Sequence, residues 1–431
     1  MNDPDLSALA TPLALASRVL VVDQFGGHGM DGLRAIGCDA IHNQLLTSQT
    51  LELAVRDVNP DILVVRSMRV TEAVLNASER LGLVVCTGSS VASIDVEAAS
   101  RSGILVAHCP GRSAAAVAEL AWALILGCDR RLPDHVSAVR SGDRGESSSG
   151  HHAESAGLAG RTLGIVGLGQ VGQEIAKRGA AFGMHVVAWS RNITESRCDA
   201  LGIDYCANLV NLAKLSDVVS VSVTANEESH GLLGEKFFNA LHAGATLINT
   251  SLGEVVDEAA LLKAVRTKRI RAGLDLHEYA ASIESRPLLA QLVREPGVYG
   301  TMQSGAMTEQ ACEAIDQEVV RIVRQWLEHG TVSGCVNRTG DSSAVTLIHI
   351  RHVNRPGVFA NIFDVLGKAG INVEEMENVI CAGGEAAIAR IHLNAPPTEG
   401  DIALIRQTPH VFGVTVQAIR RSDSALKRTQ S

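Results

Sequence analysis

A glycine-rich turn between a predicted strand and a predicted helix constrains this chain most. The turn is Gly167-Leu-Gly-Gln-Val-Gly172, after an apolar run over 162–167 and before a predicted helix over 173–182. In this setting Gly167 makes the tight turn, Gly169 lets the backbone approach a pyrophosphate, and Gly172 opens the helix and lets it pack closely on the strand. The helix N-terminus adds free N–H groups and a positive dipole end. The turn, with Gln170 and Val171 inside it, therefore predicts a dinucleotide site, and a tight turn without a ligand is the alternative.

Short apolar runs rich in β-branched residues recur on both sides of this turn. They lie at 18–23, 61–66, 83–86 and 104–107 before it, and at 186–190, 218–223, 245–249 and 270–275 after it. Such runs are typical of strands that are buried on both faces of a parallel sheet. Helical segments alternate with them, among them a long apolar helix over 114–130. We therefore predict an α/β fold with two doubly wound parallel-sheet domains of the Rossmann type.

The C-terminal part of the chain predicts a third, smaller domain. An amphipathic helix over 309–329 precedes a polar segment, 330–343, that is typical of a linker. Strand-like runs at 344–350 and 387–393, with a helix over 357–369 between them, predict a βαββαβ sandwich. The predicted division is 1–118 with 304–330 for a flavodoxin-like substrate-type domain, 119–303 for a Rossmann NAD(P)-binding domain, 331–344 for a linker, 345–421 for the third domain and 422–431 for a tail.

Composition excludes several classes of function. The 431 residues carry a net charge of -9, and no run of Lys or Arg forms a basic stripe, which argues against a nucleic-acid or membrane partner. The longest apolar stretch, 114–128, is interrupted by Glu119 and is too short to span a bilayer, so we expect a soluble, cytoplasmic protein. Nine cysteines lie scattered without a C-x-x-C pair, which favours reduced thiols and no metal site.

The end of the strand after the glycine turn bears on the choice of cofactor. A carboxylate there would bind the adenosine ribose of NAD, but this chain has Ser190-Arg191. A serine followed by an arginine can bind a 2′-phosphate, so the pair favours NADP over NAD. The alternative is an arginine that is merely exposed to solvent.

Two further segments, together with the glycine turn, carry a family resemblance. Ile248-Asn-Thr-Ser-Leu-Gly-Glu-Val-Val-Asp257 and Gly300-Thr-Met-Gln-Ser-Gly-Ala-Met-Thr308 keep the frame of two dehydrogenase active-site segments. The chain resembles the D-isomer-specific 2-hydroxyacid dehydrogenases, and most closely the phosphoglycerate dehydrogenases of serine synthesis. That resemblance implies hydride transfer with NAD(P), assisted by an Arg, a Glu and a His. It also makes Asp275 the carboxylate that contacts the nicotinamide amide, although Asp275 could instead cap a turn.

The three catalytic positions of the family are all substituted here. Leu252 stands at the Arg position, and a leucine cannot fork two hydrogen bonds onto a carboxylate. Ala280 aligns with the Glu, and Gln303 aligns with the His but has no proton-accepting pKa near neutrality. No catalytic residue is therefore assigned. His277, close to Ala280, is the possible substitute base, with surface exposure as the alternative reading.

The resemblance also implies two sites for small molecules. In the substrate-type domain Arg66 and Ser67 match the segment that meets a substrate anion, and Gly88 is retained in the next loop, although Arg66 could pair with a local carboxylate. In the C-terminal part, His352-Val-Asn-Arg-Pro-Gly-Val358 and Gly370-Ile-Asn-Val373 resemble an ACT domain. Asn354, Gly357 and Asn372 then match its effector contacts, for an amino acid such as serine. A domain that serves oligomerisation alone is the alternative.

The intact frame and its missing catalytic groups lead to three hypotheses. The first is a phosphoglycerate-dehydrogenase-like, NAD(P)-binding protein with an amino-acid-sensing domain, in which hydride transfer is silent or strongly altered. The second is an active NAD(P)-dependent 2-hydroxyacid or 2-oxoacid oxidoreductase that uses displaced groups. The third is a structural partner subunit of an active dehydrogenase. We expect a homo-oligomer, or a hetero-oligomer with such a dehydrogenase.

Overall fold

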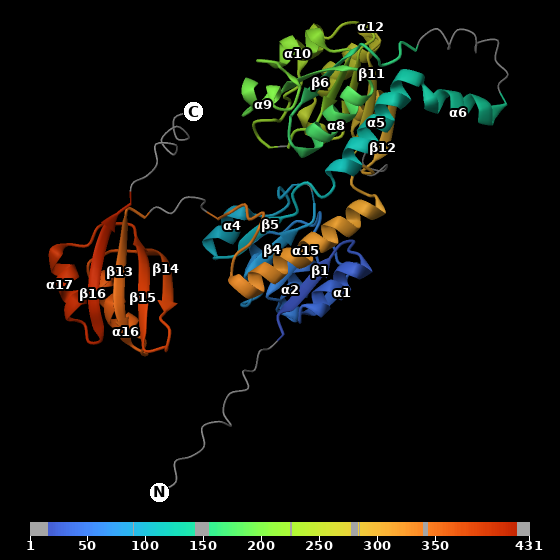
Figure 1. Cartoon of the computed structure of the whole chain (residues 1–431). Coiled ribbons are helices and arrows are strands. Elements are labelled where there is room, and N and C mark those ends of the chain that lie inside the picture. Colours follow the sequence, from blue (N-terminus) through green and yellow to red (C-terminus); the bar gives the residue numbers. More distant parts are fainter. Residues whose placement is uncertain are drawn as a thin grey trace. The chain divides into compact units, whose positions relative to one another are not determined.

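The computed structural model describes residues 16–88, 90–142, 155–224, 226–276, 283, 285–338 and 344–419. Contacts between residues divide the chain into two compact units, with the boundary between Asn337 and Arg338. The first unit holds two parallel sheets and the second holds one antiparallel sheet (Figure 1). No helix in these described ranges is both long enough and apolar enough to cross a membrane.

The first sheet has five parallel strands in the order β2-β1-β3-β4-β5. Its strands are β1 (Arg18–Val22), β2 (Asp39–Asn43), β3 (Ile62–Val65), β4 (Leu83–Cys86) and β5 (Leu105–His108). Helices α2 (Leu51–Val58), α3 (Glu72–Leu75) and α4 (Val96–Arg101) cover one face. Helices α1 (Gly27–Ala35) and α15 (Glu309–His329) cover the other face. Because both faces are covered, alternate residues of β1, β3, β4 and β5 enter one of two apolar cores.

The second sheet has seven parallel strands in the order β12-β11-β10-β9-β6-β7-β8. They are β6 (Thr162–Val166), β7 (His185–Trp189), β8 (Asp204–Tyr205), β9 (Val218–Val221), β10 (Thr246–Asn249), β11 (Arg271–Leu276) and β12 (Val298–Met302). Helices α5 (Ala114–Arg130) and α8 (Gln170–Ala181) pack on one face. Helices α10 (Leu209–Leu215), α11 (Glu235–Ala240), α12 (Glu258–Lys268) and α14 (Pro287–Leu292) pack on the other. Helices α6 (Leu132–Ser141) and α9 (Glu195–Asp199) complete this part of the chain.

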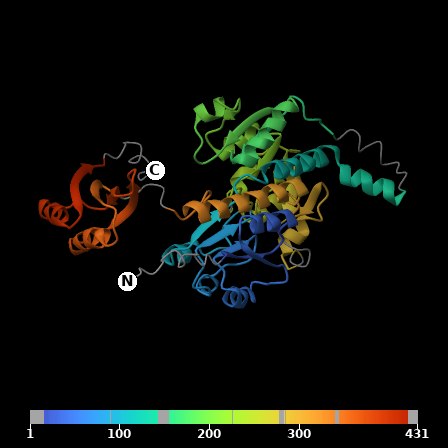
Figure 2. The ribbon, with the colours of Figure 1, turned by 60° about the horizontal axis from the view of Figure 1, so that its bottom comes forward.

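The second unit has the predicted βαββαβ order. Its elements are β13 (Thr346–Val353), α16 (Val358–Lys368), β14 (Val373–Ile380), β15 (Ala386–Leu393), α17 (Glu399–Gln407) and β16 (Val411–Ala418). The strands pair antiparallel in the order β14-β15-β13-β16. Both helices lie on one face of this sheet, where they enclose its apolar core (Figure 2). The predicted fold class, two doubly wound parallel-sheet domains and a smaller βαββαβ domain, is thus confirmed.

One detail of the predicted glycine turn is wrong. Helix α8 begins at Gln170, with Gly169 as its N-cap, so Gly172 lies in the first turn and does not open the helix. The physical reason is that Gln170 and Val171 already follow a residue with extended backbone, which is the conformation of an N-cap. The edge strands β2, β8 and β12 were also not predicted, and they are more exposed and less uniformly apolar than the central strands.

A buried carboxylate fixes the place where the chain leaves the second sheet. Asp275 on β11 is 6% exposed and accepts three hydrogen bonds. The donors are the Thr301 hydroxyl on β12, at 2.8 Å, and the N–H groups of Ser304 and Gly305, both at 2.9 Å. Ser304 and Gly305 lead directly into α15, which packs on the first sheet. Asp275 therefore holds the segment that connects the two sheets.

Substitution of this carboxylate by an amide should destabilise the first unit. In Asp275→Asn one oxygen becomes an NH₂ group that faces backbone donors, so the free energy of unfolding should fall by about 3 kcal/mol. Urea unfolding measures this loss. The matched control is Asp31→Asn, since Asp31 forms an exposed ion pair with Arg34 and should cost under about 1 kcal/mol. Equal losses in both variants would contradict the role given to Asp275.

Candidate functional site

A cavity of about 550 Å³ lies within the first unit, where loops from both sheets meet. From the first sheet it is lined by residues that follow or end β3, β4 and β5, among them Arg66, Gly88 and His108. From the second sheet it is lined by residues after β6, β9 and β10 and near the end of β11, among them Gly169, Ser222, Thr250 and Asp275. The carboxyl ends of parallel strands are where α/β folds bind ligands. The cavity is therefore the candidate functional site.

The three glycines of the turn have different surroundings. Gly167 has φ of +95°, and a Cβ there would lie 2.5 Å from the Ser222 carbonyl oxygen. A Cβ at Gly172 would lie 2.1 Å from the Gly167 carbonyl oxygen, so the helix could not approach the turn with any side chain at this position. Gly169 lines the cavity, and a Cβ there would meet no atom within 4 Å. Two glycines thus permit the turn to form, and the third leaves open space in front of it.

The first turn of α8 offers an anion site beside Gly169. The first backbone N–H of this helix with an acceptor is that of Gln173, which donates to the Gly169 carbonyl at 2.9 Å. In the described part of the chain the N–H groups of Gln170, Val171 and Gly172 have no acceptor. Such groups and the helix dipole bind phosphate. These residues therefore fit the pyrophosphate of a dinucleotide.

The predicted cofactor-choice residues follow β7. Arg191 forms an ion pair with Glu228, and the two side chains are 50% and 71% exposed. Arg191 thus already has a carboxylate partner, although an exposed pair of this kind is weak. To bind a 2′-phosphate, Arg191 would have to leave Glu228 or share its charge between the two anions. Sequence reasoning missed Glu228, because it lies far from Arg191 in the chain.

The segment 248–257 keeps its frame for structural reasons. The Ser251 hydroxyl donates to the Val221 carbonyl at 3.3 Å and accepts from the Val223 N–H at 3.0 Å. Asn249 accepts from the Ser251 N–H at 3.0 Å, and Asp257 caps α12 by accepting from the Ala260 N–H, also at 3.0 Å. Ser251 thus links the loop after β10 to the end of β9, Asn249 fixes the backbone of that loop, and Asp257 caps α12.

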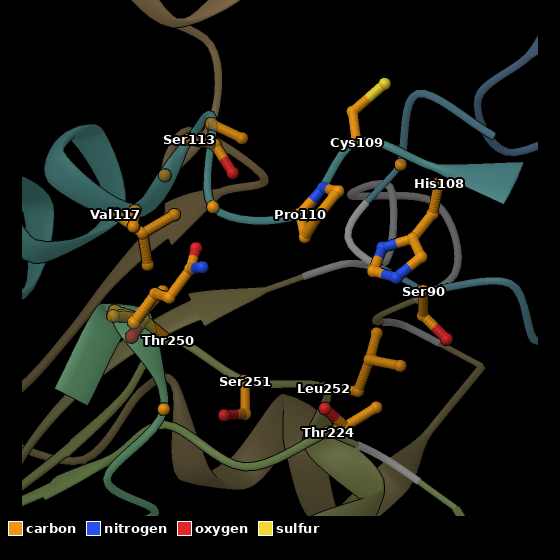
Figure 3. A pocket seen from close by; sticks show the side chains of 18 of the residues that line it. Ser90, His108, Cys109, Pro110, Ser113, Val117, Thr224, Thr250, Ser251 and Leu252 are labelled. Carbon is orange, nitrogen blue, oxygen red and sulfur yellow. The ribbon is translucent and has the colours of Figure 1, made fainter. Parts of the chain in front are cut away.

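The Leu252 side chain, by contrast, makes no hydrogen bond, and it lines the cavity. Figure 3 shows its side chain pointing toward His108 and Ser90. Gln303 lines the cavity from the other predicted segment, in a backbone conformation with φ of +48°. The structure thus brings Leu252, Gln303 and Asp275 to one cavity. Positions 277 and 280, with His277 and Ala280, lie outside the described residues.

The predicted anion contacts are held in place by an aspartate that sequence reasoning missed. Asp23, directly after β1, has φ of +66° and accepts from the backbone N–H groups of Arg66 at 2.9 Å and Ser67 at 3.1 Å. Gly88 lets the next loop pack closely, because a Cβ there would lie 2.6 Å from the Arg66 carbonyl oxygen. The Arg66 guanidinium donates to the Met307 sulfur at 3.0 Å. Among the described residues it has no carboxylate partner.

A neighbouring arginine is structural. Arg112, in the loop after β5, pairs with Glu318 on α15 at 2.7 Å, and Glu318 also pairs with Arg321. Glu318 is buried, and these two guanidinium groups lower its pKa. The sequence carried a signal for this pairing, since Glu318 lies on the apolar face of the helix that also presents Ile315 and Ile322.

His108 ends β5 and lines the same cavity. Burial lowers its pKa below the ordinary value for histidine. Cys109 follows it, and burial raises the pKa of that thiol to about 12, so Cys109 is neutral and unreactive near pH 7. In the described ranges no three His, Cys, Asp or Glu side chains gather as a metal site.

Comparison with known proteins places this geometry in a family. Residues 122–301 match the model of the D-isomer specific 2-hydroxyacid dehydrogenase NAD binding domain. The chain is 30% identical to D-3-phosphoglycerate dehydrogenase of Methanocaldococcus jannaschii over 322 residues, which are 74% of this chain and 59% of that protein. It is 37% identical to glyoxylate reductase of Thermococcus litoralis over 228 residues, 52% of this chain and 68% of that protein.

Solved structures agree with these relatives. The TT0316 protein of Thermus thermophilus is 30% identical, with a TM-score of 0.65 over 74% of this chain and 99% of that chain. This chain spans only 59% of the length of the Methanocaldococcus enzyme, so the activity of that enzyme does not transfer to it directly. The glycine turn and strands β6 to β11 lie within residues 122–301, the part of the chain that matches the family model. The chain belongs to the D-isomer specific 2-hydroxyacid dehydrogenase family and carries its NAD-binding domain.

Proposed function

We propose that this chain binds a nicotinamide dinucleotide and that the ordinary oxidation of 2-hydroxy acids is silent in it. One observation carries the proposal: Leu252 and Gln303 line the cavity where relatives are expected to hold a cation and a base, while the glycine turn beside them is intact. In this proposal the chain shares its fold with phosphoglycerate dehydrogenase. It differs from that enzyme in the groups that would perform the chemistry.

Oxidation of a 2-hydroxy acid needs a base for the hydroxyl proton and a cation that holds the carboxylate. A nicotinamide, when bound, would supply only the hydride acceptor. Leu252 offers no hydrogen bond to a carboxylate, and Gln303 does not take up a proton near neutral pH. Groups that act as one catalytic unit lose several orders of magnitude in rate when the unit is removed. Silence toward 2-hydroxy acids therefore follows from these two positions together with Ala280.

Cofactor binding should depend on Gly169 without affecting stability. In Gly169→Ala the added methyl meets no protein atom within 4 Å, so the unfolding midpoint should not change. The methyl does occupy the space proposed for the pyrophosphate, so affinity for NADH and NADPH should fall about tenfold or more. Fluorescence titration of both cofactors measures this effect, and tighter binding of NADPH would support the preference proposed from Ser190 and Arg191.

The matched control for this experiment is Gly27→Ala at the start of α1. A Cβ at Gly27 also meets nothing within 4 Å, but the residue lies away from the cavity. Gly27→Ala should leave cofactor affinity unchanged. If the unaltered chain binds neither cofactor, the proposed function is wrong.

Restoring the three family groups should create the missing activity. The unaltered chain and the triple variant Leu252→Arg, Ala280→Glu, Gln303→His are assayed with 3-phosphohydroxypyruvate and a panel of 2-oxo acids, with NADH and NADPH. We expect the triple variant to exceed the unaltered chain by at least about a thousandfold, because the three groups act together. Leu45→Arg, at an exposed leucine, adds the same charge far from the chemistry and should have no effect. Robust turnover of these acids by the unaltered chain would contradict the proposal.

We also propose that the second unit is an ACT-type domain that binds an amino acid. Gly357 has φ of +90° and is the N-cap of α16, and in the described part of the chain the first N–H of this helix with an acceptor is that of Asn361, which donates to the Gly357 carbonyl at 3.5 Å. Asn354 donates from its amide to the Gly384 carbonyl at 2.9 Å, and Asn372 donates to Glu374 at 3.2 Å. Asn354 follows β13 and Asn372 precedes β14, and because both strands pair antiparallel with β15, the two asparagines lie at opposite ends of the sheet. Within one chain a small ligand could therefore contact only one of them. Their amides can donate to a carboxylate and accept from an amine.

Titration of the full chain with L-serine by calorimetry tests this part of the proposal. We expect saturable binding that Asn372→Ala weakens about tenfold or more, because one amide contact is lost. Gln417→Ala on β16 is the control, since its side chain is exposed and lies on another strand. Absence of serine binding would favour a domain kept for oligomerisation alone. Assembly as a homo-oligomer, or with an active dehydrogenase, stays a prediction.

A further inference from the structure

We propose that this cavity interconverts an alcohol and its carbonyl compound that have no carboxylate on the reacting carbon, and that His108 transfers the proton. The inference rests on the cofactor binding proposed above and adds a substrate class and a catalytic residue. On this inference, the chain does not oxidise 2-hydroxy acids because its cavity accepts a different class of substrate.

The backbone of His108 is held from both sides. On one side β5 pairs with β4, with Cys86 opposite His108. On the other side the segment after α15 runs along β5: the His108 N–H donates to the Gly334 carbonyl at 3.1 Å, and the Val336 N–H donates to the Val106 carbonyl at 2.8 Å. A Cβ at Gly334 would lie 2.5 Å from the His108 carbonyl oxygen, so this approach requires glycine. The imidazole therefore projects from a rigid position, as an acid–base group must.

The imidazole itself is free to bind a ligand. It lines the cavity, and among the described residues its ring nitrogens have no hydrogen-bond partner. In Figure 3 the ring is drawn next to the side chains of Ser90 and Leu252, and all three residues line the cavity. A partly buried imidazole with neither nitrogen engaged can exchange a proton with a ligand that enters the cavity.

The charges around His108 leave it neutral near pH 7. The other titratable side chains that line the cavity, in the part of the chain that the structure describes, are Arg66, Cys109 and Asp275. Cys86 on β4 and Cys335 opposite β5 also belong to the elements packed against it. None of these groups shifts the pKa of His108, which burial alone lowers. Neutral imidazole is the form that accepts a proton from an alcohol.

The anion contacts of the cavity define the substrate class. Arg66 is the only Lys or Arg among the described residues that line the cavity, and it comes from the first sheet. One acidic group of a ligand can therefore be bound by Arg66. A carboxylate attached to the reacting carbon would face Leu252, at the position where relatives are expected to have a cation. Leu252 instead favours an uncharged group at that place.

The proton and electrons balance in both directions. In reduction, the hydride that a reduced nicotinamide supplies forms the new C–H bond, and the π electrons of the carbonyl move to its oxygen. That oxygen then takes the proton from the Nε2 or Nδ1 of protonated His108, which becomes neutral. In oxidation, neutral His108 takes the hydroxyl proton while the C–H electrons leave as hydride. Reduction should therefore rise as pH falls through the lowered pKa of His108, and oxidation should rise as pH increases through it.

The test compares two ligands that differ only at the group on the reacting carbon. Dihydroxyacetone phosphate carries a hydroxymethyl group where 3-phosphohydroxypyruvate carries a carboxylate. With NADH or NADPH we expect the unaltered chain to reduce dihydroxyacetone phosphate at least about tenfold faster than 3-phosphohydroxypyruvate. His108→Gln should lower that rate by at least about a hundredfold, the usual contribution of a positioned acid or base. His329→Gln, at the exposed end of α15, is the control.

Two measurements besides turnover separate the possible failures. Cofactor affinity and the unfolding midpoint of His108→Gln should equal those of the unaltered chain, because His108 makes no side-chain hydrogen bond in the described structure. The imidazole NMR signal that is missing in His108→Gln should titrate below pH 6.5 and shift when dihydroxyacetone phosphate is added. If the unaltered chain binds neither NADH nor NADPH, the proposed function is wrong. Cofactor binding without reduction of this ketone, or reduction that His108→Gln leaves unchanged, would overturn the present inference alone.

Discussion

The three hydrogen bonds to Asp275 are the interaction on which the cavity depends. They are made at the end of β11, and they fix Ser304 and Gly305 before the chain enters α15. Because α15 then packs on the first sheet, the position of this turn helps to determine how the carboxyl ends of the two sheets face each other. A carboxylate accepts such bonds strongly without a ligand. Asp275 is therefore required by the fold whatever reaction the cavity performs.

The same reasoning explains why the frame around Leu252 is intact. Ser251 links the loop after β10 to β9, Asn249 fixes the backbone of that loop, and Asp257 caps α12, so the loss of these hydrogen bonds would cost stability. The Leu252 side chain makes no hydrogen bond and lines the cavity. A change at this position alters chemistry and leaves the fold in place. Within this one short segment, the residues that stabilise the fold are thus distinct from the residue that lines the cavity.

Much of this architecture could be predicted from the sequence, because its signals are local. The central strands are uniformly apolar, the glycines of the turn are fixed by backbone sterics, and α15 has a clear amphipathic period with caps at both ends. The edge strand β2 alternates exposed and half-buried residues and lacks such a signal. The carboxylates that bind the Arg66 backbone N–H and the Arg191 guanidinium could not be predicted, because Asp23 and Glu228 lie far from these arginines in the chain. Pairings of that kind are set by the tertiary fold.

Burial shifts the pKa values of two neighbouring residues at the end of β5, His108 and Cys109, in opposite directions, and both shifts favour the neutral form. It lowers the pKa of His108 and raises that of Cys109, since a low-dielectric surrounding disfavours the charged form of each group. Both side chains are therefore neutral near pH 7. With Asp275 occupied by protein donors, Arg66 is left as the cation available to a ligand among the described residues that line the cavity. The same desolvation that keeps this wall uncharged makes His108 a base that is already deprotonated when an alcohol enters.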